Sequence, residues 1–241
     1  MYRISLFICL AFLVTPLLTV AASNPGLGGV EASLGMNFPN IKAKRIAKTD
    51  IDGLFEILLP NDEVIYFSSQ SGHLVVGEIW TKEGRNLTKE SKGKLMTAKI
   101  EMFPLEKAIK IGNGPIQVIE VADPDCPFCR EGSAFFSGRK DVTRYVFLLP
   151  LERIHPEAAQ KARYVLSSED PILAYEEAMG GRFDNEPVPE FKDNGLLDEH
   201  LAVAKKVGLN GTPKYWINGE FVSGNNLQEI EKLLDAGKAT K

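Results

Sequence analysis

Cysteine and histidine are scarce in this sequence. Of its 241 residues only three are cysteine: Cys9, Cys126 and Cys129. A secreted protein stabilised by disulfides uses more cysteines at longer separations, because closing a short loop constrains the unfolded chain least. The histidines are scattered without the spacing of metal ligands, and a structural zinc site usually has four ligands. They are His73, His155 and His200. We therefore expect neither a structural disulfide nor a metal site.

Long apolar runs are also missing beyond residue 22. Before that point Arg3 is the only charge, and residues 4–14 form an apolar run. Small residues at 20–22 offer a cleavage site, which completes the pattern of a secretory signal peptide. A transmembrane anchor is the alternative, but Pro16 interrupts the stretch, which is near the short limit for spanning a bilayer. We expect residues 1–22 to be removed and the mature chain to be soluble, without membrane insertion.

The charge balance narrows the class of partner. The chain has 28 basic and 32 acidic residues, and of these only Arg3 lies within residues 1–22. The mature chain is therefore acidic, which argues against nucleic acid as a partner. Cys9 also leaves with the signal peptide, so the mature chain keeps a single cysteine pair, Cys126 and Cys129.

The first part of the mature chain has the pattern of a small β-rich domain. Apolar runs at residues 54–59 and 64–67 are separated by a turn signal, and residues 74–81 follow as a further strand. Residues 23–40 are rich in glycine and proline, and their pattern predicts no element. A sheet of this size is marginal alone, and an exposed edge strand invites pairing with a second copy.

From residue 104 the pattern changes to alternating strands and helices. The lysine-rich residues 88–103 are interpreted as a linker helix weakened at Gly93. Amphipathic spacing predicts helices up to about residue 138, across about 151–208 and at the C-terminus. Apolar runs predict five strands, at residues 108–111, 116–122, 142–149, 214–217 and 220–222.

One motif carries recognisable chemistry, Cys126-Pro127-Phe128-Cys129, between a predicted strand and a predicted helix. At a helix N-terminus the unpaired N–H groups and the dipole favour negative charge, which lowers the pKa of a thiol. Pro127 suits the first turn, where its missing N–H would be unpaired anyway. We expect Cys126 to be an exposed nucleophile and Cys129 to be a buried thiol that resolves mixed disulfides. A c-type haem is excluded, because Arg130 rather than histidine follows the pair.

The order of strand, Cys-x-x-Cys, helix and a late Thr212-Pro213 before a strand resembles the thioredoxin fold. Cys126 and Pro213 are 87 positions apart with a helical stretch between them, which resembles the helical insertion of periplasmic disulfide oxidoreductases. A β-rich region precedes this part, and residues 122–129 read Ala-Asp-Pro-Asp-Cys-Pro-Phe-Cys. With these features the chain is similar to the DsbC/DsbG family of bacterial disulfide isomerases.

This resemblance implies an α+β fold with a defined domain layout. A thioredoxin-like catalytic domain would occupy residues 104–241, with a helical insertion at about 151–208. A small β-rich, cystatin-like dimerisation domain would precede it at residues 23–87, followed by the linker helix at 88–103.

The resemblance also implies roles for residues near the cysteines. Pro213 would be cis and lie against the pair, and Thr212 would expose its backbone to the substrate chain. The dipeptide Pro127-Phe128 departs from the Gly-Tyr of DsbC-type isomerases and the Pro-Tyr of DsbG-type proteins. Because that dipeptide affects the redox poise, the balance between isomerase, reductase and oxidase activity stays open. No cofactor is implied.

Two further polar residues have less certain roles. Glu120 interrupts the predicted strand six residues before Cys126. A buried acid at that spacing assists proton transfer at the inner cysteine in thioredoxin and DsbA, and burial raises the pKa of such a carboxyl. An equally open alternative is that Glu120 faces solvent or forms an ion pair. His155, followed by proline, is interpreted as the start of a helix rather than as a chemical group.

Together these features predict a periplasmic, homodimeric thiol-disulfide oxidoreductase that isomerises or reduces non-native disulfides in misfolded secreted proteins. Isomerisation requires Cys126 to be reduced at rest, so the resemblance implies a membrane reductase of the DsbD type as a partner. A DsbG-like reductase of sulfenylated cysteines is the closest alternative, with the same nucleophile. A monomeric dithiol oxidase and a holdase chaperone are further alternatives. The N-terminal region argues against the oxidase, and the intact cysteine pair argues against a chaperone alone.

Overall fold

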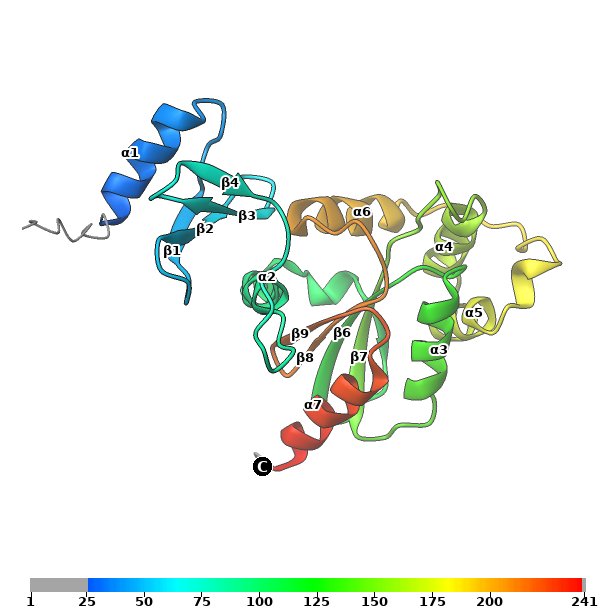
Figure 1. Ribbon diagram of the computed structural model, residues 1–241. Helices are drawn as coiled ribbons and strands as arrows, with labels where there is room; N and C mark the ends of the chain where they lie inside the picture. The colour runs from blue at the N-terminus through cyan, green and yellow to red at the C-terminus, as the bar shows by residue number, and fades with distance from the viewer. Residues whose placement is uncertain (1–25, 240–241) are drawn as a thin grey trace, which may run out of the picture. The chain divides into compact units, whose positions relative to one another are not determined.

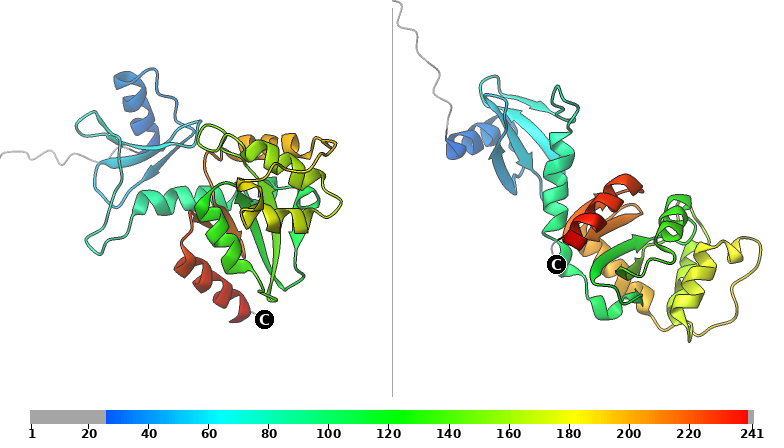
Figure 2. Two further views of the ribbon diagram at one scale, coloured as in Figure 1. Left: turned by 90° about the vertical axis from the view of Figure 1, so that its right-hand side faces the viewer. Right: turned by 90° about the horizontal axis from the view of Figure 1, so that it is seen from below.

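The computed structural model describes residues 26–239, and the predicted signal peptide at 1–22 lies outside them. The described part divides into two compact units (Figures 1 and 2). The first holds the residues up to Leu59 together with Ile65–Val75, and the second holds Pro60–Val64 and the residues from Val76 on. Within residues 26–239, no helix has the length and hydropathy needed to cross a membrane.

The first unit combines one helix with a four-stranded sheet. The strands lie in the sheet in chain order, and the pairs β1–β2 and β3–β4 are antiparallel. The elements are α1 (Leu27–Asn37), β1 (Arg45–Lys48), β2 (Leu54–Leu58), β3 (Val64–Ser68) and β4 (His73–Val75).

Helix α1 forms in a segment whose sequence pattern predicts no element. Three of its eleven residues are glycine, which is a weak helix former. Val30 and Leu34 are four positions apart on one face, and both are buried against the sheet, in a cluster with Phe55 and Phe67. The helix therefore depends on tertiary burial of this face rather than on intrinsic propensity.

Strand β4 is shorter than the sequence predicts. The expected strand at residues 74–81 ends at Val75, and beyond it an isolated bridge joins Trp80 to Asn86. The neighbouring side chains of Val75 and Val76 are both exposed, at 48% and 81%. The sequence pattern had indicated a buried strand face here. The exposure of these two side chains shows that the segment has none at this point.

The second unit is built on a five-stranded mixed sheet of order β5-β7-β6-β8-β9. The central strands β6 and β7 are parallel, and the remaining pairs are antiparallel. All five predicted strands are confirmed to within one residue at each end. They are β5 (Ile109–Ile111), β6 (Ile116–Ala122), β7 (Val142–Leu148), β8 (Lys214–Ile217) and β9 (Glu220–Ser223).

Helices cover both faces of this sheet (Figure 2). On β6, Val118 and Ala122 face α3, α5 and α7, whereas Ile119 and Val121 face α6 and the segment that contains η1. The helices are α2 (Leu87–Thr97), α3 (Pro127–Phe136), α4 (Ala158–Ser167), α5 (Pro171–Met179), α6 (Leu196–Val207) and α7 (Leu227–Ala239). Short 3-10 helices are η1 (Ile100–Met102), η2 (Leu105–Lys107) and η3 (Arg182–Asp184).

The predicted linker and insertion segments are largely helical. Residues 88–103 form α2 and η1, and Gly93 lies within α2 without interrupting it. Residues 151–208 contain α4, α5, η3 and α6, as predicted, and residues 185–195 between η3 and α6 have no regular structure. Pro187 and Pro189 lie in that gap, and proline both removes a backbone donor and clashes with a preceding helical turn.

A buried ion pair joins the two parallel strands beneath α3. Glu120 of β6 is fully buried, and one of its carboxylate oxygens accepts bonds from Arg144 Nε at 2.9 Å and Nη2 at 2.7 Å. The hydroxyl of Tyr175 on α5 donates to its other oxygen at 3.0 Å. Both alternatives for Glu120 are thus partly right, since the acid is buried and it is also paired.

We predict that Glu120→Leu lowers the free energy of unfolding by about 3–5 kcal/mol, because it leaves the Arg144 guanidinium buried without its partner. The double variant Glu120→Leu/Arg144→Met should recover most of that loss, since an apolar pair can replace a buried ion pair at little cost. Urea unfolding of the three proteins measures both effects. Equal instability of the single and double variants would contradict this account of the pair.

Candidate active site

Cys126 and Cys129 lie where β6 passes into α3. Strand β6 ends at Ala122, a short turn follows, and Cys126 is the N-cap of a helix whose first residue is Pro127. This confirms the predicted placement of the motif. Both cysteines are free thiols in the structure.

The exposure of the two sulfurs differs from the prediction in degree. Cys129 is fully buried, as expected, but Cys126 is only 5% exposed rather than open to solvent. The exposed residue of the motif is Phe128, at 60%. Cys126 is covered because the loop at Thr212 lies against it: its Sγ is 3.9 Å from the Thr212 carbonyl oxygen.

The surroundings of the two sulfurs separate their acidities. Hydrogen bonds from the Cys129 thiol, and from the backbone N–H groups of Cys129 and Phe128, lower the pKa of Cys126 to about 5 against the opposing effect of burial. Burial raises the pKa of Cys129 far above its usual range, and the interaction with Cys126 adds to this. Cys126 is therefore the thiolate of the pair at neutral pH, and Cys129 is the protonated donor.

Thr212 and Pro213 meet this pair from the far end of the sequence. The bond between them is cis, as predicted, and it immediately precedes β8. The sheet brings them there, because β8 pairs antiparallel with β6, the strand that leads into the motif. The hydroxyl of Thr212 is buried beside the two sulfurs, and its interaction with them lowers the pKa of both thiols.

The sequence pattern did not predict a network of ion pairs beside the motif. Asp125 accepts bonds from Arg130 at 3.1 Å and from Lys161 at 2.6 Å, and both cations also bind Asp184. These contacts join α3 to α4 and η3, so they fix the insertion beside the cysteines. The pKa of Asp184 is lowered to about 2, chiefly by its bond from Arg130. The acidic tripeptide before Cys126 was visible in sequence, but its partners are distant in the chain.

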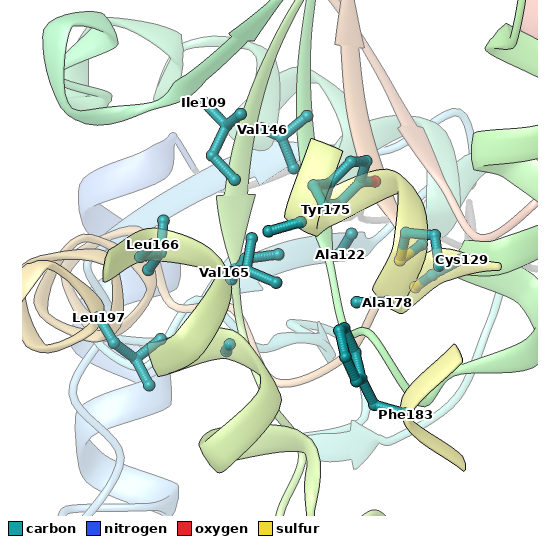
Figure 3. Close-up of a cluster of buried hydrophobic side chains, with 14 of the residues drawn as sticks. Ile109, Ala122, Cys129, Val146, Val165, Leu166, Tyr175, Ala178, Phe183 and Leu197 are labelled. Atoms are coloured by element: carbon teal, nitrogen blue, oxygen red, sulfur yellow. The ribbon is translucent and has the colours of Figure 1, made fainter. Parts of the chain in front are cut away.

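The apolar floor of the site comes from the helical insertion. Cys129 belongs to one buried cluster with Ala122, Tyr175, Ala178 and Phe183 (Figure 3).

Among residues 26–239, no group of three His, Cys, Asp or Glu side chains is arranged to hold a metal ion.

Comparison with family models identifies both parts of the chain. Residues 105–238 match the model described as a thioredoxin-like domain, which covers more than half of the sequence. The chain belongs to the thioredoxin-like family. Residues 19–89 match the N-terminal domain of the disulfide bond isomerases, so the resemblance to the DsbC/DsbG branch of this thioredoxin-like family is confirmed.

Curated relatives agree with this assignment. Over 197 residues the chain is 27% identical to a protein of Bordetella avium named "probable thiol:disulfide interchange protein DsbC", covering 80% of this chain and 69% of that protein. A Bordetella pertussis protein of the same name is 25% identical over 207 residues, covering 84% and 72% of the two chains.

Two solved structures are similar to part of this chain. A disulfide interchange protein of Neisseria gonorrhoeae is 34% identical, covering 56% of this chain and 98% of that one, with a TM-score of 0.49. A linker-deletion variant of Proteus mirabilis ScsC is 19% identical, covering 64% and 88% of the two chains, with a TM-score of 0.51. This second likeness supports the fold alone.

Alkylation kinetics test the acidity of the outer thiol in this thioredoxin-like site. We predict that the rate of Cys126 alkylation by iodoacetamide is constant above about pH 6 and falls to half near pH 5, since only the thiolate reacts. Cys129→Ala should move the midpoint upward, because the thiol of Cys129 is the largest stabiliser of the Cys126 anion. A midpoint near the ordinary thiol value in the unsubstituted protein would refute the assigned geometry.

Proposed function

We propose that this protein is an enzyme that isomerises or reduces non-native disulfides in secreted proteins, with Cys126 as nucleophile and Cys129 as resolving thiol. The observation that carries the proposal is the placement of two free thiols at one helix N-terminus, with Cys126 at the N-cap and Cys129 fully buried one turn further in. The pKa of Cys126 is lowered to about 5, and that of buried Cys129 is strongly raised. Cys126 is therefore ionised and able to attack at neutral pH, whereas Cys129 beside it stays protonated.

The first step is thiolate attack on a client disulfide. The Cys126 anion bonds to one client sulfur, and the other client sulfur leaves as a thiolate. In isomerisation, a client thiolate then attacks the mixed disulfide and expels Cys126 unchanged, so no electrons are gained or lost. Because Cys129 is rarely a thiolate, the mixed disulfide persists long enough for a client thiol to compete.

Reduction is the second outcome of the same intermediate. Cys129 loses its proton and attacks the Cys126 sulfur, the client sulfur leaves and takes up a proton, and a Cys126–Cys129 disulfide forms. Two electrons have then passed to the client, and a dithiol reductant must restore them. A membrane reductase of the DsbD type is the partner we assign to this step.

Client recognition is assigned to the surface around the motif. The exposed Phe128 ring offers an apolar contact next to the reacting sulfur. The Thr212 carbonyl oxygen lies 3.9 Å from Cys126 Sγ, and we assign the backbone of Thr212, which precedes cis Pro213, to the client chain. Pro127 contributes by starting α3 immediately after the nucleophile. We infer that Glu120 acts by fixing the sheet beneath α3 through Arg144.

The cellular setting follows from the N-terminal part of the chain. We assign residues 1–22 to a cleaved signal peptide and the mature protein to the periplasm, where disulfides of secreted proteins form. The first unit, which matches the N-terminal domain of disulfide bond isomerases, is assigned to homodimerisation. Strands β1 and β4 are its sheet edges, and edge strands offer unpaired backbone groups to a second copy.

Reactivation of scrambled ribonuclease measures the proposed activity. The unsubstituted protein should restore ribonuclease activity, and Cys126→Ser should reduce the rate to background because no attacking thiolate remains. Cys129→Ser is the matched control, and it should retain part of the isomerase activity since client thiols can still release Cys126. Thiol-independent recovery would indicate a chaperone instead. Faster oxidation of reduced ribonuclease than reactivation of the scrambled form would indicate an oxidase.

Sedimentation tests the assignment of the first unit. The mature chain should sediment at twice the mass of one chain, and a variant that begins at Val76, where the second unit resumes, should sediment as a monomer. Retention of Cys126 alkylation at low pH in the shortened variant is the control for its folding. Monomers in both samples, or dimers in both, would contradict dimerisation through the first unit.

A further inference from the structure

Asp123 occupies an unusual position between the cysteine pair and the protein interior. It follows the last residue of β6, and its side chain is fully buried. Its backbone N–H donates to Cys129 Sγ at 3.4 Å, and this bond works against burial by lowering the pKa of Cys129. Its carbonyl oxygen accepts the N–H of Cys126 at 3.1 Å. The same residue therefore contacts both halves of the motif through its backbone.

The carboxylate of Asp123 is held by three hydrogen bonds. Oδ1 accepts the N–H of Asp125 at 2.8 Å, and Oδ2 accepts the N–H of Leu151 at 2.7 Å. The third contact joins Oδ2 to Nδ1 of His155 at 2.8 Å. Because a carboxylate has no proton to donate, Nδ1 of His155 is the donor in this third bond.

His155 is fixed in place by its own loop. The backbone N–H groups of Ile154 and His155 donate to the Leu151 carbonyl, both at 2.9 Å, and Ala158 N–H donates to the His155 carbonyl at 3.1 Å. The ring is partly exposed, with 18% of its side-chain surface open. The partly exposed His155 ring thus bonds to the fully buried carboxylate of Asp123. The backbone N–H of Asp123 in turn donates to Cys129 Sγ.

The other charged side chains beside the motif form ion pairs with one another. Asp125 binds Arg130 and Lys161, and Asp184 binds the same two cations. Within residues 26–239 Asp123 accepts no hydrogen bond from Arg or Lys, although Arg130 attracts it from a longer distance, and His155 is the one side chain there that bonds to it. Without that donor, a buried negative group beside two sulfurs would be less neutralised, and a thiolate there would be less stable.

We propose that His155 is a positioning residue for the cysteine pair, acting through the Asp123 carboxylate to favour the dithiol form over the disulfide. The imidazole N–H draws negative potential away from the sulfurs and keeps the Asp123 N–H aimed at Cys129. The inference rests on the proposed thiol-disulfide chemistry and adds a group that tunes its equilibrium. It also replaces the interpretation of His155 as the start of a helix, since α4 begins at Ala158.

Equilibration with reduced and oxidised glutathione tests the proposal on the full mature chain. Three substitutions differ only in where they place a donor. Asn puts its amide N–H where Nδ1 lies, Gln puts it about one bond further out, and Leu removes it. We expect His155→Gln and His155→Leu to shift the equilibrium toward the Cys126–Cys129 disulfide by roughly tenfold, the scale of one hydrogen bond to a charged group. His155→Asn should stay within about twofold of the unsubstituted protein, on the same scale.

The alkylation midpoint of Cys126 provides the second readout, and it should rise in the Gln and Leu variants but not in Asn. His73→Leu is the control, because His73 is an exposed residue of the first unit. If the Leu variant fails to fold, the comparison of Asn with Gln decides. An unchanged equilibrium in Gln and Leu overturns the proposal, and so does an Asn variant shifted as far as Leu. Failure of the unsubstituted protein to reactivate scrambled ribonuclease would instead refute the proposed function.

Discussion

A nearly buried thiolate is the constraint on which the rest of this site depends. Cys126 must carry negative charge at neutral pH although only 5% of its surface meets solvent. Water cannot stabilise that charge, so the protein must supply N–H and S–H donors from the first turn of α3 and from Cys129. Those donors are aligned only when β6, the turn and α3 keep their register.

The charges beneath and beside α3 follow from the same constraint. Glu120 is paired with Arg144 inside the sheet, and Asp125 is matched by cations from α3 and α4. Unmatched negative charge at either place would oppose the thiolate, because interactions are strong where water is excluded. Asp123 departs from this pattern, since a ring N–H of His155 rather than an Arg or Lys side chain donates to its carboxylate, and we infer that this single contact tunes the pair.

The pKa values of the two thiols differ because the two sulfurs are buried to different depths, not because of their positions in the sequence motif. They stand at equivalent ends of a four-residue motif, yet one caps the helix and the other lies one turn further in, within the apolar cluster that the insertion builds. An attacking group that is always ionised and a resolving group that is rarely ionised prolong the mixed disulfide. That asymmetry is the physical basis for assigning isomerisation, and it depends on residues as distant as Phe183 of η3.

Sequence alone determined the strands of the second unit, the motif and its place at a helix N-terminus, because periodicity and cysteine spacing are local signals. The role of the late Thr212-Pro213 was implied only by the resemblance to the thioredoxin fold. The sequence did not reveal α1, whose glycines conceal a face that forms only against its sheet. Nor did it reveal the partners of Glu120 or the link from His155 to Asp123. Tertiary structure decided those, since hydrogen bonds and burial depend on which distant segments meet, and no local pattern encodes that distance.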